Sequence, residues 1–314
     1  MQNLIITLDI VAPVFLIIFI GFLLQRVKII NNNFNRVASK VVFQVALPAL
    51  VFERIATVRF SDVFSIKLIL FGILAISLLF ALFSIFSRTC CKTGREQGAF
   101  IQGSVRSNFA ILGMALIYNA FGETALSKAA IVLALLLPFL NIYSILALVL
   151  PLHKEESPSI SKTFIDIIKN PLIIAAFVAL PFSIFHIPIH DIFTKTIGYL
   201  SNLTLPLALL AIGGQLTFQS MRDDFREAAW AGMNKTILMP FLITLCAILL
   251  GFRGENLGIL FFLGAAPTAI SSYPMADALG SNARLAGNII LITTVGAIFT
   301  VTAGIFILKS LGYF

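Results

Sequence analysis

The chain alternates between long apolar runs and short polar connections. Each run stays apolar for about twenty residues, the length that an α-helix needs to cross the hydrocarbon core of a bilayer. The runs are continuously apolar and lack the alternating polarity of transmembrane β-strands. The pattern predicts an all-α polytopic membrane protein with ten transmembrane helices, over residues 4–24, 37–56, 63–86, 98–121, 126–151, 165–186, 194–217, 234–252, 256–279 and 285–308.

Only two polar connections have appreciable length. They are residues 152–163 (LHKEESPSISKT) and residues 218–230. The second connection contains the stretch MRDDFREAAW, which we expect to form a helix lying on the membrane surface. Neither connection is long enough for a separate soluble domain.

Composition strengthens the membrane assignment. Soluble domains carry about 25% charged residues, whereas this chain of 314 residues is 11% charged and 59% hydrophobic, with a mean hydropathy of +1.01. The run at 4–24 has no basic segment before it and no cleavage site, so we expect a membrane helix there and not a signal peptide. The net charge of +8 comes mostly from Lys and Arg in short connections, so we expect no nucleic-acid partner.

The distribution of Lys and Arg predicts the orientation. The side that holds the connection between the first and second runs carries about twice as many basic residues as the other side. Lys235 is one of the basic residues expected in the loops of this more basic side. Because basic loops stay in the cytoplasm, we expect a multi-pass protein of the cell (inner) membrane with both termini outside.

The two halves of the chain share landmarks at one fixed offset. A shift of 158 residues superposes prolines and glycines of corresponding helices: Pro13 on Pro171, Leu47-Pro48 on Leu205-Pro206, and Gly122 on Gly280. Each half contains five helices, and because this number is odd, the second half must cross the membrane in the opposite orientation to the first. The sequence therefore predicts two inverted five-helix repeats, residues 1–151 and 164–314, joined by the cytoplasmic loop 152–163.

The fourth and ninth helices carry matched interruptions. Pro267, in LGAAPTAISSYPMADALG, lacks a backbone N–H and should break the ninth helix. At the same offset, the fourth helix contains Ser107 and Asn108, which favour the start of a new half-helix. Two broken helices would then cross near the midplane and direct free N–H groups at a common point, which suits a carboxylate or another anion.

Arg106 precedes this break and lies about nine residues from the cytoplasmic end of its helix, close to the midplane at ~1.5 Å per residue. Three interpretations stay open: it belongs to the anion pathway, it pairs with Asp277, or it snorkels to the interface and anchors the helix. Asn108 could instead bind a neighbouring helix, and Pro267 could mark a simple kink.

Further polar residues complete the candidate substrate site. Thr268, Ser271, Ser272 and Tyr273 follow Pro267 within about one turn, where a half-helix would present side chains to a ligand. Asn141 and Asn288 follow the broken helices and could line the same cavity or form packing hydrogen bonds. Asp277 could carry a coupling proton or ion, or lie at a solvated helix end.

Four motifs resemble the auxin efflux carrier family over nearly the whole chain: VAPVFLIIFIGFLLQR, VALPALVFERIA, RSNFAILGMAL and GAAPTAISSYPMADALG. The resemblance implies a scaffold of helices 1, 2, 6 and 7, a mobile transport domain of helices 3–5 and 8–10, a substrate site at the crossover, an elevator motion and a homodimer. It implies that Asn108 contacts substrate and that Pro267 is the ninth-helix break. The long regulatory loop of plant members is absent, which argues against auxin itself and favours bacterial-type carboxylate permeases.

The leading function is a secondary transporter of a small organic anion. The chain has no GxxxxGK[ST] nucleotide motif, so an ion gradient, of protons or sodium, or the substrate's own gradient must drive it. A channel or sensor is the main alternative. An intramembrane enzyme is less favoured, because the three histidines lie at loops or boundaries and the helices contain no paired acids. We expect no cofactor and no metal.

Overall fold

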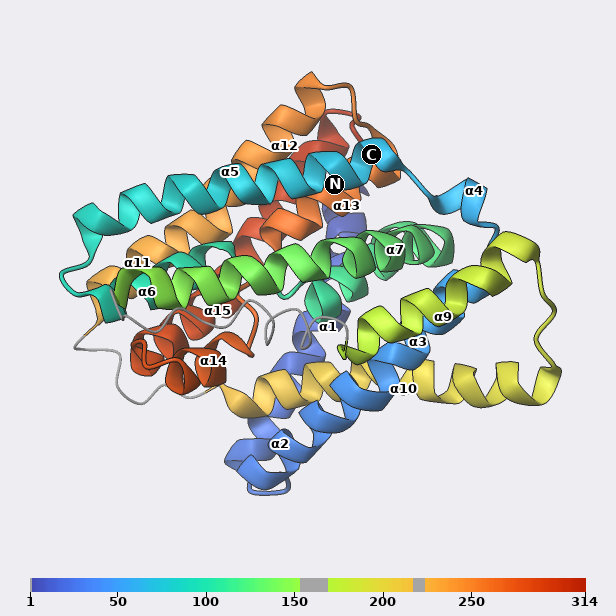
Figure 1. Ribbon diagram of the computed structural model, residues 1–314, viewed down its shortest axis with the longest axis horizontal. Coiled ribbons are helices and arrows are strands. Elements are labelled where there is room, and N and C mark those ends of the chain that lie inside the picture. The colour runs from blue at the N-terminus through green and yellow to red at the C-terminus, as the bar shows by residue number, and fades with distance from the viewer. Residues whose placement is uncertain (1, 153–168, 217–223) are drawn as a thin grey trace.

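The computed structural model describes residues 2–152, 169–216 and 224–314, and in these ranges the chain is helical (Figure 1). Six helices there are long and apolar enough to cross a membrane: Gln2–Arg26, Ile66–Cys90, Phe109–Leu152, Asp191–Gln215, Phe225–Leu249 and Ala283–Ser310. Two shorter apolar helices accompany them. The predicted loop 152–163 and the first part of 218–230 fall almost entirely outside the described residues.

The first half of the chain runs from α1 to α7. Its elements are α1 (Gln2–Arg26), α2 (Asn32–Val41), the π-turn η1 (Val42–Ala46), α3 (Leu47–Ala56), α4 (Phe60–Val63), α5 (Ile66–Cys90), α6 (Gly94–Val105), the π-turn η2 (Phe109–Gly113), α7 (Met114–Val149) and η3 (Leu150–Leu152). α2, η1 and α3 form one continuous helix. α7 contains a break at Gly122, whose φ of 79° and ψ of −161° are not helical.

The second half of the chain, from α9 to α15, also contains long and interrupted helices. Its elements are α9 (Pro171–Phe185), α10 (Asp191–Gln215), α11 (Phe225–Met233), the π-turn η4 (Asn234–Leu238), α12 (Met239–Leu249), α13 (Gly254–Ala265), α14 (Ser272–Ala278) and α15 (Ala283–Ser310). Asn170 caps α9 by accepting from the Leu172 N–H, and Pro171 occupies the first turn, where its missing N–H costs nothing.

One predicted element is wrong. Phe225 and the residues after it do not form a separate surface helix but begin the membrane-length helix Phe225–Leu249. Small side chains explain the difference: Ala228 and Ala231 are fully buried against neighbouring helices, while the charged side chains belong to the first turn. The helix therefore starts nine residues earlier than predicted, and Lys235 lies inside it and not in a loop.

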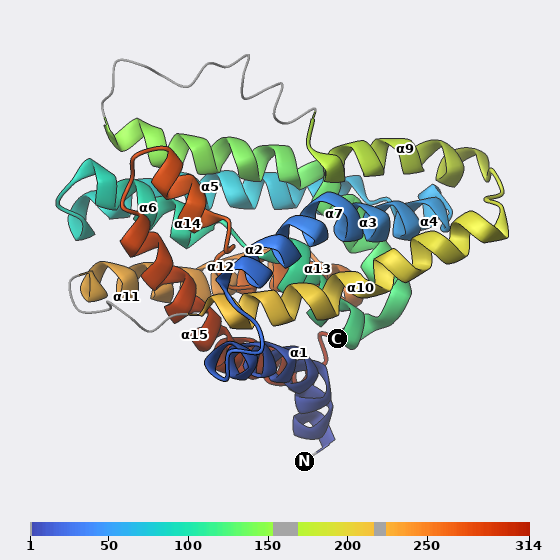
Figure 2. The ribbon, with the colours of Figure 1, turned by 90° about the horizontal axis from the view of Figure 1, so that it is seen from below.

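The helices fall into two groups, which we call the α1–α10 group and the α5–α15 group. The α1–α10 group comprises α1, α2, η1, α3, α9 and α10, with α1 along α10 and α3 along α9. The α5–α15 group comprises α5 to α7 and α11 to α15. Figure 2 shows α2, α3 and α10 crossing beside α7 and α13, where the groups meet.

Glycine allows a close helix contact between α1 and α10. A Cβ atom on Gly213 of α10 would overlap the carbonyl of Ile18 on α1, and one on Gly21 would overlap the carbonyl of Leu210. Backbone-to-backbone approach of this kind is the way small residues let membrane helices associate without a hydrophobic driving force. The two helices are thus held by reciprocal glycine contacts.

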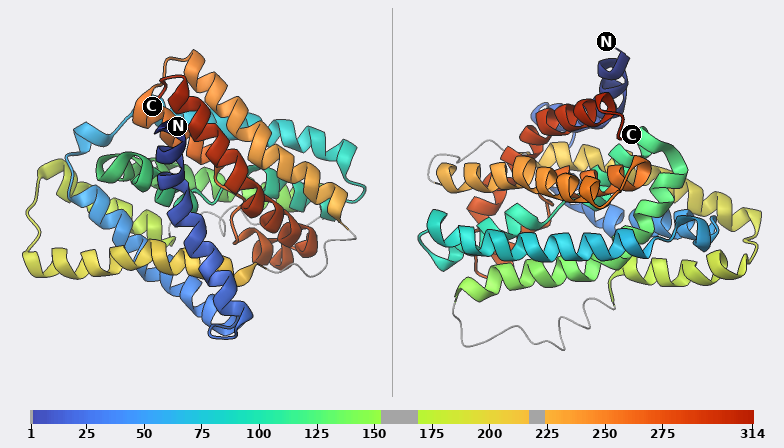
Figure 3. Two further views of the ribbon diagram at one scale, coloured as in Figure 1. Left: turned by 180° about the vertical axis from the view of Figure 1, so that it is seen from behind. Right: turned by 90° about the horizontal axis from the view of Figure 1, so that it is seen from above.

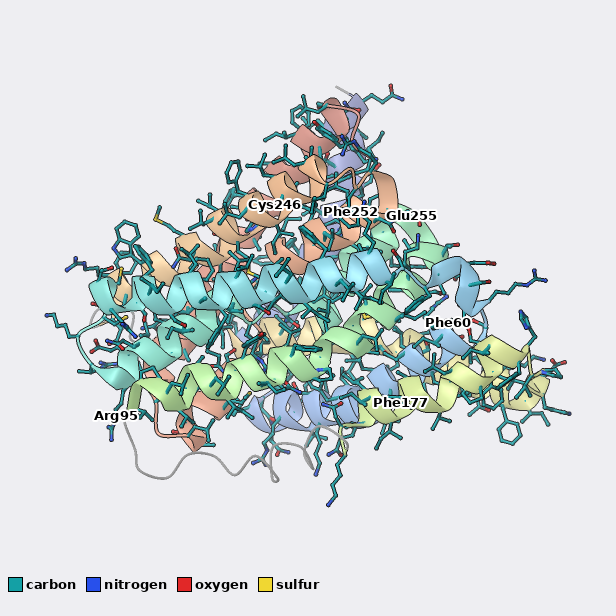
Figure 4. All side chains as sticks on the ribbon, turned by 45° about the horizontal axis from the view of Figure 1, so that its top comes forward. Phe60, Arg95, Phe177, Cys246, Phe252 and Glu255 are labelled. Atoms are coloured by element: carbon teal, nitrogen blue, oxygen red, sulfur yellow. The ribbon has the colours of Figure 1, made fainter. Side chains whose placement is uncertain are left out.

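The outer surface and the ends of the molecule fit a membrane setting. Large apolar side chains such as Phe177 and Phe299 are 65% and 70% exposed, which suits contact with lipid. Arg95 lies at one end of the molecule, and Phe60 and Glu255 lie towards the opposite side (Figure 4). The termini lie near each other (Figure 3). Asn3 at the start of α1 donates a hydrogen bond of 3.2 Å to Ser310 at the end of α15.

Candidate functional site

Two interrupted helices meet at the centre of the site. α6 ends at Val105 and α13 ends at Ala265, so both predicted breaks are present. The interrupted segments pair with each other: the Asn108 N–H donates to the Pro267 carbonyl at 2.7 Å. The Ala269 N–H donates to the Arg106 carbonyl at 3.0 Å, which makes an antiparallel bridge between Ser107 and Thr268. We call this pairing the crossover.

The chain departs from helix at the crossover for local reasons. Pro267 has no N–H to donate to the carbonyl four residues earlier, and its ring disfavours helical geometry at Ala266, whose ψ is 137°. On the other strand, Arg106 is extended, with φ of −72° and ψ of 102°. Backbone groups that leave their helices must find partners in a membrane, and the two interruptions satisfy each other.

Side chains close the remaining hydrogen bonds of the crossover. The Thr268 hydroxyl donates to the Gly103 carbonyl at 2.6 Å, and the Thr268 N–H donates to the hydroxyl of Thr293 at 3.1 Å. The Ser107 hydroxyl donates to the Ala266 carbonyl at 3.3 Å. Thr268 and Ser107 therefore hold the two interruptions together, a role the sequence did not assign to them.

A cavity of about 790 Å³ lies between the crossover and the α1–α10 group. Residues of α2, η1 and α10 form one wall, and residues after the two helix breaks, with one face of α15, form the other. Its polar and charged lining residues are Asn32, Asn35, Arg36, Ser39, Lys40, Gln44, Asn108, Gln215, Ser271 and Tyr273. No Asp or Glu is among the described residues that line it, whereas Arg36 and Lys40 are basic.

The structure brings three of the predicted site residues to the cavity: Asn108, Ser271 and Tyr273. Asn108 occupies the position before η2, but its side chain forms no cap hydrogen bond with that turn. The other candidates are not among the described lining residues: Arg106, Ser107, Asn141, Pro267, Thr268, Ser272, Asp277 and Asn288. The cavity therefore lies on the side of the crossover where the second half-helices begin.

Arg106 is directed elsewhere. Its guanidinium Nη1 donates to the hydroxyl of Ser144 on α7 at 2.6 Å, and its Nε is buried without a hydrogen-bond partner in the described part of the chain. Asp277 is exposed on α14, and among the described ion pairs Arg106 has none with it. Of the three interpretations, the pair with Asp277 is absent from this structure.

One wall of the cavity was not predicted from the sequence. Asn32, Arg36, Lys40 and Gln44 recur every fourth residue through α2 and η1, and all four line the cavity. Residues four apart share one face of a helix, so the spacing was a readable signal. From the sequence alone, Arg36 and Lys40 count only among the basic residues that predict the orientation. Gln215 of α10 joins this wall and donates to the Ser39 hydroxyl at 3.0 Å.

A smaller cavity of about 260 Å³ lies farther towards the start of α10. Its lining includes Arg54 of α3 and Glu123 of α7, which form an ion pair of 3.2 Å between the two helix groups. Asn119 also lines it and donates to the Ile10 carbonyl of α1 at 3.0 Å. These contacts join the groups on the side of the crossover away from the large cavity.

Sequence comparisons place the chain among transport proteins. A family model described as "Membrane transport protein" matches residues 6–305. A Rhizobium meliloti (strain 1021) protein named "Putative malonate transporter" is 25% identical, over 96% of this chain and 95% of its own. Two proteins named as uncharacterized transporters are also similar. That of Methanocaldococcus jannaschii is 20% identical over 92% and 94% of the two chains, and that of Methanothermobacter thermautotrophicus 22% over 91% and 93%.

Proposed function

The chain belongs to the membrane transport protein family, the auxin efflux carrier family that its motifs resemble, and from that premise we propose that it is a secondary transporter of a small organic anion, best matched by a carboxylate. Membership makes the chain a membrane transporter and not an enzyme. Its apolar helices make it a multi-pass membrane protein. The substrate class and the mechanism are the proposed part.

The observation that carries the proposal is the chemistry of the large cavity. Its described lining combines Arg36 and Lys40 with neutral hydrogen-bonding side chains, and its described part contains no acid. Charge-assisted hydrogen bonds from such groups suit a carboxylate. Among the described lining residues, a cation would find no counter-charge. The volume of about 790 Å³ lies in the range of small-molecule sites and leaves room for water around a small anion.

The helix end at the crossover also favours a negatively charged ligand. η2 begins directly after Asn108, so the helix that continues into α7 presents its amino end at the edge of the cavity. The amino end of a helix carries partial positive charge and N–H groups without intrahelical partners. Asn108, with Ser271 and Tyr273 from the other break, would hydrogen-bond the anion, while Arg36 and Lys40 attract it from the opposite wall.

The proposed architecture is ten transmembrane helices in two inverted repeats, 1–151 and 164–314. In this arrangement the α1–α10 group contains scaffold helices 1, 2, 6 and 7, and the α5–α15 group is the mobile transport domain. The cavity between the two groups supports an elevator, because substrate held by the crossover would move with the α5–α15 group along the scaffold. We further propose a homodimer in the cell membrane with both termini outside.

Malonate is the first substrate to test, because a relative carries that name. The purified protein is screened by thermal shift against mono- and dicarboxylates, aromatic acids and amino acids, since a ligand of the folded state raises stability by RT ln(1 + [L]/Kd). Hits are then tested for saturable uptake and counterflow in proteoliposomes. A carrier shows both. Uptake that neither saturates nor shows counterflow would identify a channel and overturn the proposal.

A further inference from the structure

A lysine is buried in the middle of a membrane-length helix. Lys235 lies in η4, within the helix Phe225–Leu249, and is 0% exposed. A charged side chain at membrane depth persists when it has a specific partner or function. The large cavity does not use it, because Lys235 is not among the described lining residues. Its burial therefore calls for a separate account.

The partner of Lys235 is the end of another helix. Its ammonium Nζ donates to the carbonyl oxygen of Gly264 at 2.6 Å and lies 3.3 Å from the sulfur of Met239. Among the described ion pairs, no carboxylate is bonded to Lys235. The contact with Gly264 reaches the last turn of α13, directly before the crossover.

The helix break is the reason that this carbonyl is available. In an uninterrupted helix the Gly264 carbonyl would accept from the N–H of Thr268. That N–H donates instead to the hydroxyl of Thr293 at 3.1 Å. The carboxyl end of α13 thus presents carbonyl groups without helical partners, and these carry partial negative charge that a cation complements. In transporters with broken helices, such carbonyls and helix ends can coordinate a bound Na⁺.

We infer that Lys235 is a tethered cation of the crossover: its ammonium takes the place of a bound metal ion at the carboxyl end of α13 and fixes the electrostatics of the anion site. This inference rests on the proposed function. The tethered charge offsets the negative end of α13 beside the crossover, while the amino end at η2 keeps its positive potential towards the cavity. Lys235 acts as a positioning residue, since it touches the helix end and not the cavity.

The test removes the charge in two ways. Lys235→Ala removes the ammonium and leaves a space, and Lys235→Met removes the charge but keeps most of the volume. We expect malonate binding to weaken roughly ten- to thirtyfold in both, the equivalent of one charge at a partly buried helix end. Methylammonium should restore binding in Lys235→Ala, where it can enter the vacated space, and not in Lys235→Met.

Lys67→Ala is the matched control. Lys67 also donates from Nζ to a backbone carbonyl, that of Leu250 at 2.9 Å, but at an exposed helix end away from the crossover. This variant should keep wild-type binding with or without methylammonium. Wild-type affinity in Lys235→Met, or loss in Lys235→Ala that methylammonium leaves unchanged, overturns the inference.

Two measurements separate this inference from the proposed function. The melting temperature of Lys235→Ala with and without methylammonium reports the vacated site even if no carboxylate binds, so a rise supports the inference alone. Sodium chloride, compared with choline chloride, should not stabilise the wild-type protein more than it stabilises Lys235→Ala, because Lys235 already occupies the carboxyl end of α13. Greater stabilisation of the wild-type protein by sodium would overturn the inference, whereas sodium-stimulated uptake alone would only identify the coupling ion.

Discussion

At the residue scale, two candidates that lie only two positions apart in the sequence have different surroundings. Asn108 borders the large cavity and forms no cap hydrogen bond with η2. Arg106, two residues earlier, donates to Ser144 on α7 and is not among the described lining residues. In a fully extended segment, residues two apart would share one side. The extended conformation of Arg106 does not continue to Asn108, whose φ of −79° and ψ of 47° turn the chain and give its side chain other surroundings.

Asn108→Ala tests direct contact with the substrate. A hydrogen bond to a charged group contributes about 1.5–3 kcal/mol, so affinity for malonate should fall roughly ten- to hundredfold while the melting temperature changes little. Ser107→Ala is the control, because Ser107 bonds the Ala266 carbonyl inside the crossover. It should lower stability more than affinity. Normal uptake kinetics in a well-folded Asn108→Ala protein would remove Asn108 from the site.

Arg106 provides the second prediction. Because its guanidinium bonds a hydroxyl of α7 beside the carboxyl end of α6, we expect its charge to matter more than its planar geometry. Arg106→Lys should retain most transport, and Arg106→Gln should lose about tenfold, measured as initial uptake rate in proteoliposomes. A severe loss in Arg106→Lys would instead indicate bidentate contact with the anion.

The pair with Asp277 is tested by a double-mutant cycle. Since the described structure has no ion pair between them, the effects of Arg106→Gln and Asp277→Asn should add within about 0.5 kcal/mol. Recovery of transport in the double variant would require a second conformation in which the two residues meet.

At the element scale, π-turns recur near the large cavity and the crossover. η1 precedes Pro48 and η4 precedes Pro240, and a proline that cannot donate to the carbonyl four residues earlier loosens the turn before it. The turn at η1 carries Gln44 into the large cavity, and the turn at η4 carries Lys235. Each of these two turns thus carries one long polar side chain, Gln44 or Lys235.

The contact between α1 and α10 gives a prediction about stability. A methyl group on Gly213 would overlap the Ile18 carbonyl, and a backbone atom cannot move aside as a side chain can. Gly213→Ala should therefore destabilise the protein by about 1–3 kcal/mol, seen as a lower melting temperature. Gly296→Ala on α15 is the control, since its methyl would meet Thr236 at an ordinary 3.4 Å. Equal melting temperatures would mean that α1 and α10 are not packed as described.

At the scale of the whole molecule, the two helix groups touch differently on the two sides of the crossover. The large cavity separates them on one side, whereas Arg54–Glu123 and Asn119–Ile10 contacts join them on the other. In an alternating-access transporter, the Arg54–Glu123 and Asn119–Ile10 contacts would have to separate when the side that holds the large cavity closes. The structure corresponds to one end state of such a cycle under the proposed elevator.

Crosslinking tests that motion. In a background with Cys90, Cys91 and Cys246 replaced by alanine, cysteines at Ile10 and Asn119 would join the two groups. Transport should stop on oxidation and return on reduction. A cysteine pair at Val58 and Ser183 is the control, because this contact of 2.6 Å lies within the proposed scaffold. Full transport with the Ile10–Asn119 crosslink in place would contradict movement between the groups.

Orientation is tested by labelling. With the native cysteines replaced, a cysteine introduced at Ser157 should react with a membrane-impermeant thiol reagent only in inverted vesicles, because the basic side is expected to be cytoplasmic. A cysteine at Gln2 should react in intact cells. Labelling of the Ser157 position from outside would reverse the proposed topology.

The amino-acid sequence by itself determined the helical membrane class and the positions of both helix breaks. Apolar runs of membrane length must form helices, because lipid offers no hydrogen-bond partners to the backbone. Pro267 lacks a backbone N–H, so it interrupts its helix whatever neighbours the helix packs against. The ten-span inverted repeat also came from the sequence, and it stays a prediction. The surface helix expected in MRDDFREAAW was wrong from Phe225 onward, because Ala228 and Ala231 are buried against other helices, which local polarity does not reveal.

Only the tertiary structure decided which polar residues share a space. Arg36 and Lys40 line the large cavity, and only their spacing in the sequence suggested that they share a helix face. Arg106 instead donates a hydrogen bond to Ser144, thirty-eight positions along the chain. Lys235 moved from an expected loop to a buried contact with Gly264, twenty-nine positions away. Such partners depend on how the helices pack, because a side chain's surroundings in a membrane bundle come from neighbouring helices and not from its own sequence.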